Sequence, residues 1–120
     1  MNLLTKIDPH IFNTLKLDFG EDFLEELLET FCNDSNQQLE SMQTALEEGN
    51  AEDFTRAAHT LKSTSLTFGA SAFGALAREL EMLGREGNLE ASREKFQQLY
   101  DASEPLFSEL KDMCHASENL

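Results

Sequence analysis

Apolar residues recur at helical spacing along almost the whole chain, and glycines interrupt the pattern at intervals. In the longest uninterrupted segment, Glu21–Glu48, they fall three or four residues apart, which places them on one face of a helix. The interruptions occur at Gly20, Gly49, Gly69 and Gly87. Short connections between long amphipathic helices favour antiparallel neighbours. The sequence therefore predicts an all-α fold, an up-down antiparallel four-helix bundle with a short extra N-terminal helix.

Capping and turn residues mark the ends of the expected helices. Asp8, followed by proline, opens a short first helix that we expect to end near Lys16. After the long second helix, Asn50 caps a third helix that stops near Gly69. The chain restarts at 70–71 into a fourth helix.

A last helix follows the Gly-Asn pair at 87–88, and Pro105 inside it predicts a kink or break. The expected apolar face of the second helix comprises Phe23, Leu24, Leu27, Leu28, Phe31, Cys32, Leu39, Met42 and Leu46. For the last two helices it comprises Phe73, Leu76, Leu80, Leu83, Leu89, Phe96, Leu99, Tyr100, Leu106, Phe107, Leu110 and Met113.

The composition limits the chain to one domain and narrows its partners. Its 120 residues suffice for one core, so we assign residues 1–120 to a single domain. The net charge of −14 argues against binding to nucleic acid or to an anionic membrane surface. No segment approaches the roughly 18 apolar residues of a membrane span. The first residues carry Asp8 and lack the apolar core of a secretory signal, so we expect a cytoplasmic protein, acting as a monomer.

The two cysteines, Cys32 and Cys114, lie on apolar faces of separate expected helices. We expect both to be reduced core residues. A disulfide between them stays open from the sequence.

One window of this acidic chain contains no acidic residue. From Phe54 to Arg78 there is no Asp or Glu, whereas His59 and Lys62 both lie inside the window. Arg56 precedes His59 by three residues and so lies on the same side of a helix. A chain with 23 acidic and 9 basic residues that excludes carboxylates here keeps the region open to a negatively charged group.

The histidine in this window is expected to face solvent. On a helix with about 100° per residue, His59 lies roughly 160° from Leu61, the centre of an apolar stripe. The stripe also contains Phe54, Ala57, Ala58, Thr64, Ser65 and Phe68. Lys62 and Ser63 follow His59 by three and four residues and neighbour the imidazole. Leu66, seven residues on, lies along the same outward line.

A compact motif begins at this histidine. The chain reads His-Thr-Leu-Lys-Ser-Thr-Ser from His59 to Ser65, then Gly-Ala at 69–70, then a second helix that reaches Leu-Glu at Glu81. This resembles the signature of histidine-containing phosphotransfer (HPt) domains, roughly His-x-Leu-Lys-Gly-x-Ser, Gly-Ala and a helix ending Leu-Glu or Leu-Gln. Size and helix layout agree over almost the whole chain. Ser63 replaces the usual glycine, and because serine is small we expect a partner still to approach closely.

The resemblance implies a histidine phosphotransfer protein of a multistep two-component phosphorelay. His59 would take a phosphoryl group from the aspartate of one receiver domain and pass it to another. Lys62 would stabilise the phosphoryl oxygens. Glu81, on the adjacent helix, would accept a hydrogen bond from the second ring nitrogen and orient the imidazole. For Glu81, Arg78 and Arg85 the alternative interpretation is ordinary surface charge on an amphipathic helix.

Receiver domains of response regulators or hybrid sensor kinases are the partners that the resemblance implies. The residues expected to contact them are Arg56, Ser63, Leu66, Gly74, Arg78 and Arg85. The small Ser63 and Gly74 would leave room, and Leu66 would offer apolar surface. The receiver would bring Mg²⁺, so we expect no cofactor in this chain.

Other activities lack the residues that they need. The chain has neither a glycine-rich phosphate loop nor the larger kinase fold, so we expect a phosphoryl carrier without autokinase activity, not an enzyme. His10, His59 and His115 share no ligand spacing, which argues against a metal site. The competing hypothesis is a non-transferring HPt-like helical adaptor that binds receiver domains, or binds a cationic partner through its acidic face. An intact His59 with Lys62 favours transfer.

Overall fold

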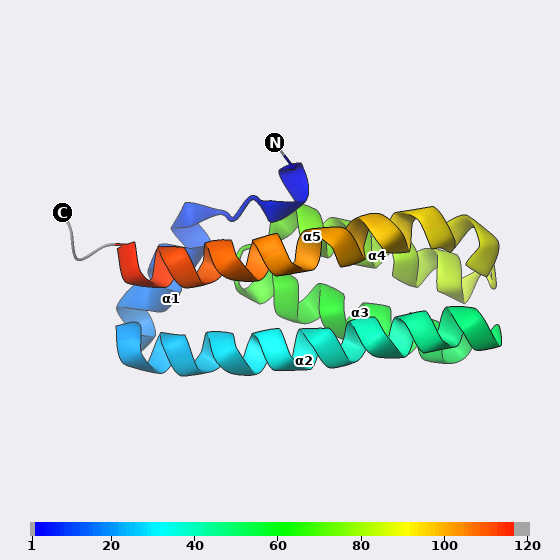
Figure 1. Cartoon of the computed structure of the whole chain (residues 1–120). Coiled ribbons are helices and arrows are strands. Elements are labelled where there is room, and N and C mark those ends of the chain that lie inside the picture. The colour runs from blue at the N-terminus through cyan, green and yellow to red at the C-terminus, as the bar shows by residue number, and fades with distance from the viewer. Residues whose placement is uncertain (1, 117–120) are drawn as a thin grey trace.

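Five α-helices and one short 3₁₀ helix form residues 2–116, the range that the computed structural model describes (Figure 1). The elements are η1 (Leu3–Thr5), α1 (Pro9–Phe19), α2 (Glu21–Glu48), α3 (Ala51–Thr67), α4 (Ser71–Arg85) and α5 (Leu89–Ala116). No strand occurs in this range, which confirms the prediction of an all-α fold. The predicted domain also included residues 1 and 117–120, which lie outside the described residues. Within 2–116, no helix has both the length and the apolar character needed to cross a membrane.

Side-chain caps begin the helices where the sequence predicted them. Asp8 Oδ1 accepts a hydrogen bond from the backbone N–H of His10 at 2.9 Å, ahead of a proline in the first turn of α1. Asn50 Oδ1 accepts one from the N–H of Asp53 at 3.0 Å at the start of α3. Gly49, which ends α2, has a φ of 70°, a left-handed conformation that glycine adopts without strain.

Two helices are longer than the sequence predicted. α1 continues past Lys16 to Phe19. α5 runs through Pro105 without interruption, so the predicted break is wrong. Pro105 lies on the exposed side of α5, where water can bond the carbonyl that proline leaves without a donor. Ala102 and Leu106, both fully buried, hold the two halves of α5 on the same core.

Helices α2 to α5 lie side by side along the long direction of the molecule, and consecutive helices run in opposite directions (Figure 1). α5 packs against both α4 and α2, which closes a ring of helix contacts around one core. α1 packs against α2, and η1 contacts α4 and α5. The largest fully buried side chains are Phe12, Leu24, Leu28, Leu39, Met42, Phe54, Leu61, Phe73, Leu80, Leu99, Leu106 and Leu110.

Two aromatic residues predicted to be in the core are at its edge instead. Phe23 and Tyr100 are 49% and 46% exposed, so that prediction is wrong for both. Each ring packs on a neighbouring ring of the chain, Phe23 on Phe19 with centroids 5.5 Å apart and Tyr100 on Phe96 at 6.0 Å. Leu83 is half-buried. Helical periodicity gives the side of a helix but not the depth at which a large ring stops.

The cysteines match their prediction. Cys32 and Cys114 are free and buried. Burial raises the pKa of each thiol above its ordinary value, which keeps both sulfurs protonated and unreactive at neutral pH.

The α3–α4 pair positions the candidate site. Two glycines of α4 face α3 at close range. A Cβ on Gly74 would lie 2.7 Å from Leu66 Cδ2, and a Cβ on Gly84 would collide with Thr55 Oγ1. The turn between the helices passes through Gly69, whose φ of 85° suits glycine. Because the two helices pack closely at both of these glycines, the side of α3 that carries His59 lies next to α4.

Candidate functional site

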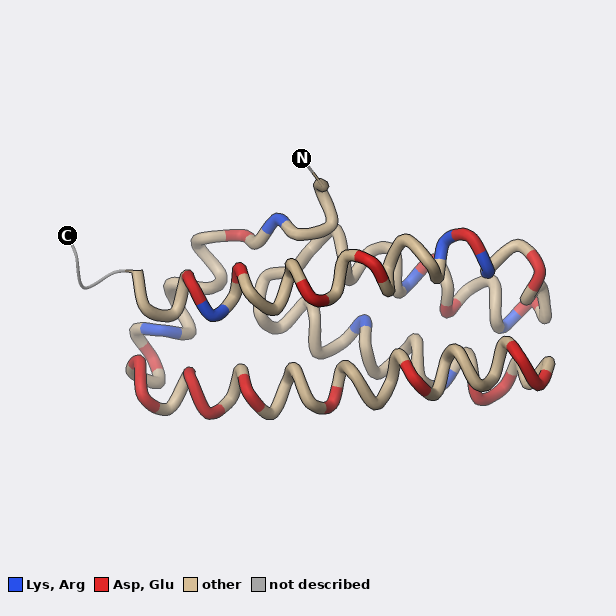
Figure 2. Tube along the Cα trace, viewed as in Figure 1, with Lys and Arg blue, Asp and Glu red and all other residues tan. Residues whose placement is uncertain are grey.

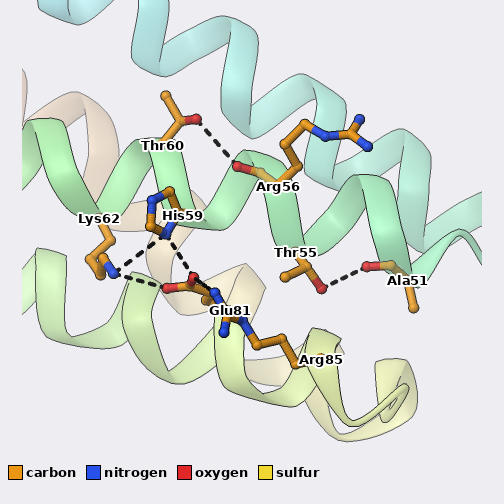
Figure 3. Close-up of polar contacts among 8 residues, drawn as sticks. All are labelled: Ala51, Thr55, Arg56, His59, Thr60, Lys62, Glu81 and Arg85. Atoms are coloured by element: carbon orange, nitrogen blue, oxygen red, sulfur yellow. Dashed lines mark hydrogen bonds and ion pairs between the residues drawn. The ribbon is translucent and has the colours of Figure 1, made fainter.

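His59 lies in the middle of α3 on a side that is open to solvent and turned toward α4 (Figure 3). Its side chain is 54% exposed, whereas Ala58 and Leu61 beside it have no exposed surface. The expectation of a solvent-facing imidazole on a packed helix is confirmed.

A carboxylate from α4 fixes one nitrogen of the ring. His59 Nδ1 lies 2.7 Å from Glu81 Oε2. Because an ionised carboxylate can only accept hydrogen bonds, Nδ1 carries the proton and the lone pair of the neutral ring lies on Nε2. A neutral imidazole held in this tautomer presents Nε2 as a nucleophile.

Glu81 is 3% exposed, so the interpretation of this residue as ordinary surface charge is wrong. It accepts hydrogen bonds from three side chains: His59, Lys62 at 3.1 Å from Oε1, and Arg85 at 2.7 Å from Oε2. Burial alone would raise the pKa of Glu81, but the bonds from His59, Lys62 and Arg85 and the Lys62 charge outweigh it and lower that pKa. Glu81 is therefore an ionised acceptor at neutral pH.

Lys62 lies beside His59 as its spacing predicted, but its ammonium group is bonded to Glu81. The distance from Lys62 Nζ to His59 Nδ1 is 3.5 Å, and two protonated nitrogens do not hydrogen-bond to each other. The Lys62 side chain is 21% exposed, less than a free surface lysine. Its charge therefore lies next to the ring and is held there by the carboxylate.

The two arginines of α4 differ in what they contact. Arg85 follows Glu81 by one turn, and its guanidinium covers the outer side of that carboxylate. Arg78 precedes Glu81 by one turn, is exposed, and forms no ion pair within residues 2–116. With Lys62 and Met82 it borders a hollow of about 270 Å³. Arg78 is therefore the α4 cation that is free to meet a partner.

Arg56 does not direct its charge at His59. Its guanidinium pairs with Asp53 at 3.0 Å and Glu52 at 3.6 Å, and Figure 3 shows it extending away from the imidazole. Both acids lie just before the acid-free window that starts at Phe54. These two acids therefore compensate the Arg56 charge on the His59 side of α3.

Of the small and apolar residues predicted at the site, Ser63 and Leu66 are accessible and Gly74 is not. Leu66 is 45% exposed, and Ser63 is also exposed. Gly74 is buried beneath Leu66. The prediction that Gly74 leaves room for a partner is wrong, because a side chain of the same protein fills that space.

A groove of about 740 Å³ extends from His59 toward the first turn of α3. Ala51 and Thr55 from α3, with Gly84 and Gly87 beside them, keep it open because their side chains are small or absent. Sequence reasoning did not identify this groove. In the sequence, the only indication of the groove is the spacing of small residues in two segments, and that spacing can be interpreted only once the two helices are known to pack together.

The arrangement supplies a nucleophile and cations. The His59 side chain is 54% exposed. The Lys62 ammonium lies 3.5 Å from His59 Nδ1, and Arg85 binds the same Glu81 oxygen as that nitrogen. Within residues 2–116, no three His, Cys, Asp or Glu side chains are grouped so that they could hold a metal ion. These groups suit the acceptance of a negatively charged electrophile such as a phosphoryl group.

Similarity to known proteins agrees with this chemistry. A family model described as Hpt domain matches residues 26–120. The chain belongs to the Hpt domain family. The crystal structure of histidine-containing phosphotransfer protein B (HptB) from Pseudomonas aeruginosa PAO1 is similar to it, with a TM-score of 0.77, 27% sequence identity and 94% of each chain covered. None of the curated proteins is similar enough in sequence to match.

The Hpt match begins inside α2 and includes α3, α4 and α5, so it contains every residue of the site. The resemblance inferred from the motif at His59 is thereby confirmed, and the chain is a histidine phosphotransfer protein. Members of the Hpt family are phosphoryl carriers.

Proposed function

We propose that this Hpt domain relays a phosphoryl group through His59 between receiver-domain aspartates in a multistep two-component phosphorelay. The observation that supports it is the 2.7 Å contact between His59 Nδ1 and Glu81 Oε2, which puts the lone pair of the neutral ring on Nε2, on a side chain that is 54% exposed.

In the accepting step, Nε2 attacks the phosphorus atom of an aspartyl phosphate on a receiver. The Nε2–P bond forms while the bond between phosphorus and the aspartate oxygen breaks, and the aspartate leaves as a carboxylate. The ring keeps its Nδ1 proton and so becomes positively charged. Glu81, ionised and hydrogen-bonded to that proton, stabilises the charge. The reverse steps pass the group to a second receiver.

Lys62 is proposed to stabilise the phosphoryl oxygens, since its ammonium lies one side chain from the ring. Ser63, Leu66 and Arg78 are the proposed contacts for the receiver because all three are exposed on α3 and α4. Arg56 borders the groove beside His59 and is proposed to contact the receiver from there. The receiver supplies Mg²⁺, and this chain needs no cofactor of its own.

The remaining features of the proposal concern the protein as a whole. It acts as a carrier without autokinase activity, as a monomer in the cytoplasm. We count α2–α5 as a four-helix bundle and α1 as the short extra N-terminal helix.

Label transfer tests the proposal. A receiver carrying radioactive aspartyl phosphate is mixed with the protein, and the label on this chain is checked for the acid-labile, base-stable behaviour of phosphohistidine. His59→Gln should abolish labelling, whereas His10→Gln, at an exposed position on α1, should not. If the wild-type protein gains no label from any receiver, the carrier function is wrong.

A second candidate function, a non-transferring adaptor, is favoured by one feature of the surface. α2 contains no lysine or arginine along its length, so the chain presents an acidic side to solvent (Figure 2). Such a surface attracts cationic partners. An adaptor would bind its partner equally well after His59→Gln, whereas a relay protein would bind a receiver but no longer take its phosphate.

A further inference from the structure

We infer that Arg85 sets the basicity of His59 through the carboxylate that the two residues share, and that it acts as a positioning residue for phosphoryl acceptance. The inference rests on the proposed function, because it assigns a role within the same site. It also changes the expected role of Arg85, from a contact for the partner to a group that acts on the imidazole through Glu81.

The inference rests on the two residues that share one oxygen atom of Glu81. His59 Nδ1 and an Arg85 guanidinium nitrogen each lie 2.7 Å from Oε2 of Glu81, while Lys62 binds the other oxygen at 3.1 Å. An acceptor oxygen whose charge is compensated by a guanidinium attracts the proton of the imidazole less strongly. Arg85 therefore weakens the acceptor that His59 uses.

Partial compensation of the Glu81 charge reconciles two opposed requirements on this carboxylate. An uncompensated carboxylate against Nδ1 would favour the imidazolium form of His59, which has no lone pair on Nε2 and cannot attack phosphorus. The same carboxylate must nevertheless stabilise the positive ring that forms on attack. With Arg85 and Lys62 both bound to it, Glu81 still orients the ring but stabilises the imidazolium form less strongly.

Other charges around the ring do not replace this effect. The charged residues that line the groove with His59 are Glu52, Arg56, Glu81, Arg85 and Glu86, and Lys62 lies beside the ring. Glu52 is paired with Arg56, so Glu81 is the carboxylate in contact with the imidazole. No residue of α2 or α5 borders the groove at His59. Arg85 is itself 66% exposed, so it can be replaced without opening the core.

The test is a titration of His59 by imidazole NMR in the wild-type protein and in Arg85→Gln. Loss of the guanidinium should raise the titration midpoint of His59 by about 0.5–1 pH unit. His10 and His115, which do not border Arg85, are internal references in the same spectra. Lys111→Gln, an exposed charge loss on α5, is the matched control and should leave the His59 midpoint in place. Arg85→Lys, which keeps a positive charge beside Glu81, should bring the His59 midpoint part of the way back to its wild-type value. An unchanged His59 midpoint in Arg85→Gln would overturn the inference.

The same titration in a Glu81→Gln background isolates the route. If Arg85 acts through the carboxylate, adding Arg85→Gln to Glu81→Gln should move the His59 midpoint by less than half of the shift seen in the wild-type background. An equal shift in both backgrounds would mean that Arg85 acts on the ring directly through space, and the shared carboxylate would be the wrong explanation.

Labelling with phosphoramidate links the titration to reactivity without a receiver. The Nε2–P bond forms as the P–N bond of phosphoramidate breaks and ammonia leaves, and the ring keeps its Nδ1 proton. The ratio of Arg85→Gln to wild-type rates, taken at each pH, should be lowest below neutral pH and rise toward higher pH. A flat ratio would contradict the inference. Failure of receivers to label the protein would contradict the relay alone, so the two ideas fail separately.

Discussion

The side chain of Leu66 lies over Gly74 so closely that a Cβ on the glycine would come within 2.7 Å of Leu66 Cδ2. At Gly84, further along α4, the obstacle is Thr55, including its backbone Cα at 3.3 Å. The Leu66 side chain is flexible and half-exposed, so it can move aside. The backbone of Thr55 cannot. The two glycines therefore limit the approach of α3 and α4 to different degrees.

Gly84→Ala should destabilise the protein by about 1–3 kcal/mol, because the new methyl group overpacks the helix contact. Gly74→Ala should be nearly neutral, since displacement of Leu66 is offset by the gain of about 0.8–1 kcal/mol in helix propensity. Urea denaturation of both variants measures the difference. Adding Thr55→Ala to Gly84→Ala should recover part of the loss. Equal losses at the two glycines would show that Leu66 is not free to move.

Leu61→Ala should lower the free energy of unfolding by about 2–5 kcal/mol, because Leu61 has no exposed surface and its truncation leaves a cavity. Leu66→Ala is the matched control on the same helix. It should lose much less, because nearly half of Leu66 is already in contact with water. Thermal and urea unfolding report both. A loss below the stated range would mean that Leu61 is not a core residue.

Lys62→Ala should slow phosphoryl acceptance by about tenfold or more, through loss of a charge next to the reacting nitrogen. Its effect on stability should stay near 1 kcal/mol, because Arg85 and His59 still bond to Glu81. Rapid-quench labelling gives the rate, and the melting temperature gives the stability. Lys111→Ala, at an exposed position on α5, is the control for net charge. An unchanged rate in Lys62→Ala would remove this residue from the mechanism.

Stability should depend on pH through Glu81. Its pKa is lower in the folded protein than its ordinary value of 4.5, so the unfolded chain binds the proton more readily. The stabilisation is therefore complete at neutral pH and is lost as pH falls from about 4.5 through the folded pKa. Urea denaturation of the wild type and Glu81→Gln at a series of pH values should show their difference shrinking over that window. A difference that stays constant to pH 3 would contradict the assignment.

Ser65→Ala should stabilise the protein by about 1 kcal/mol. The Ser65 hydroxyl is fully buried and has no hydrogen-bond partner among residues 2–116, so its desolvation is uncompensated. Ser103→Ala is the comparison, because that hydroxyl donates to the carbonyl of Tyr100 at 2.7 Å and its removal should be destabilising. If Ser65→Ala is also destabilising, the hydroxyl has a partner in solution, such as a buried water.

Much of the fold follows from local sequence. The helix starts at Asp8 and Asn50 depend on capping hydrogen bonds that span only two or three residues of the chain. The exposure of His59 follows from periodicity within one helix. The break predicted at Pro105 does not occur, because α5 turns that position toward water, which can bond the carbonyl that proline leaves without a donor.

The site itself required knowledge of how two helices meet. The spacing of His59 and Lys62 is local and could be predicted, but the burial of Glu81 depends on the register between α3 and α4. The same register puts Arg85 on the oxygen that His59 uses. It also puts Leu66 over Gly74. Periodicity assigns each residue a direction from its own helix axis and says nothing of which residue on the next helix it meets.

The absence of lysine and arginine from α2 bears on how the proposed partner arrives (Figure 2). A phosphorylated receiver that approaches α2 with its phosphoryl group foremost is repelled. Lys62 on α3, with Arg78 and Arg85 on α4, attracts the same group at the His59 site. Long-range forces would then select the productive orientation before any contact forms. Such selection weakens as the screening length shrinks, so the association rate should fall with added salt more steeply than the rate of the chemical step.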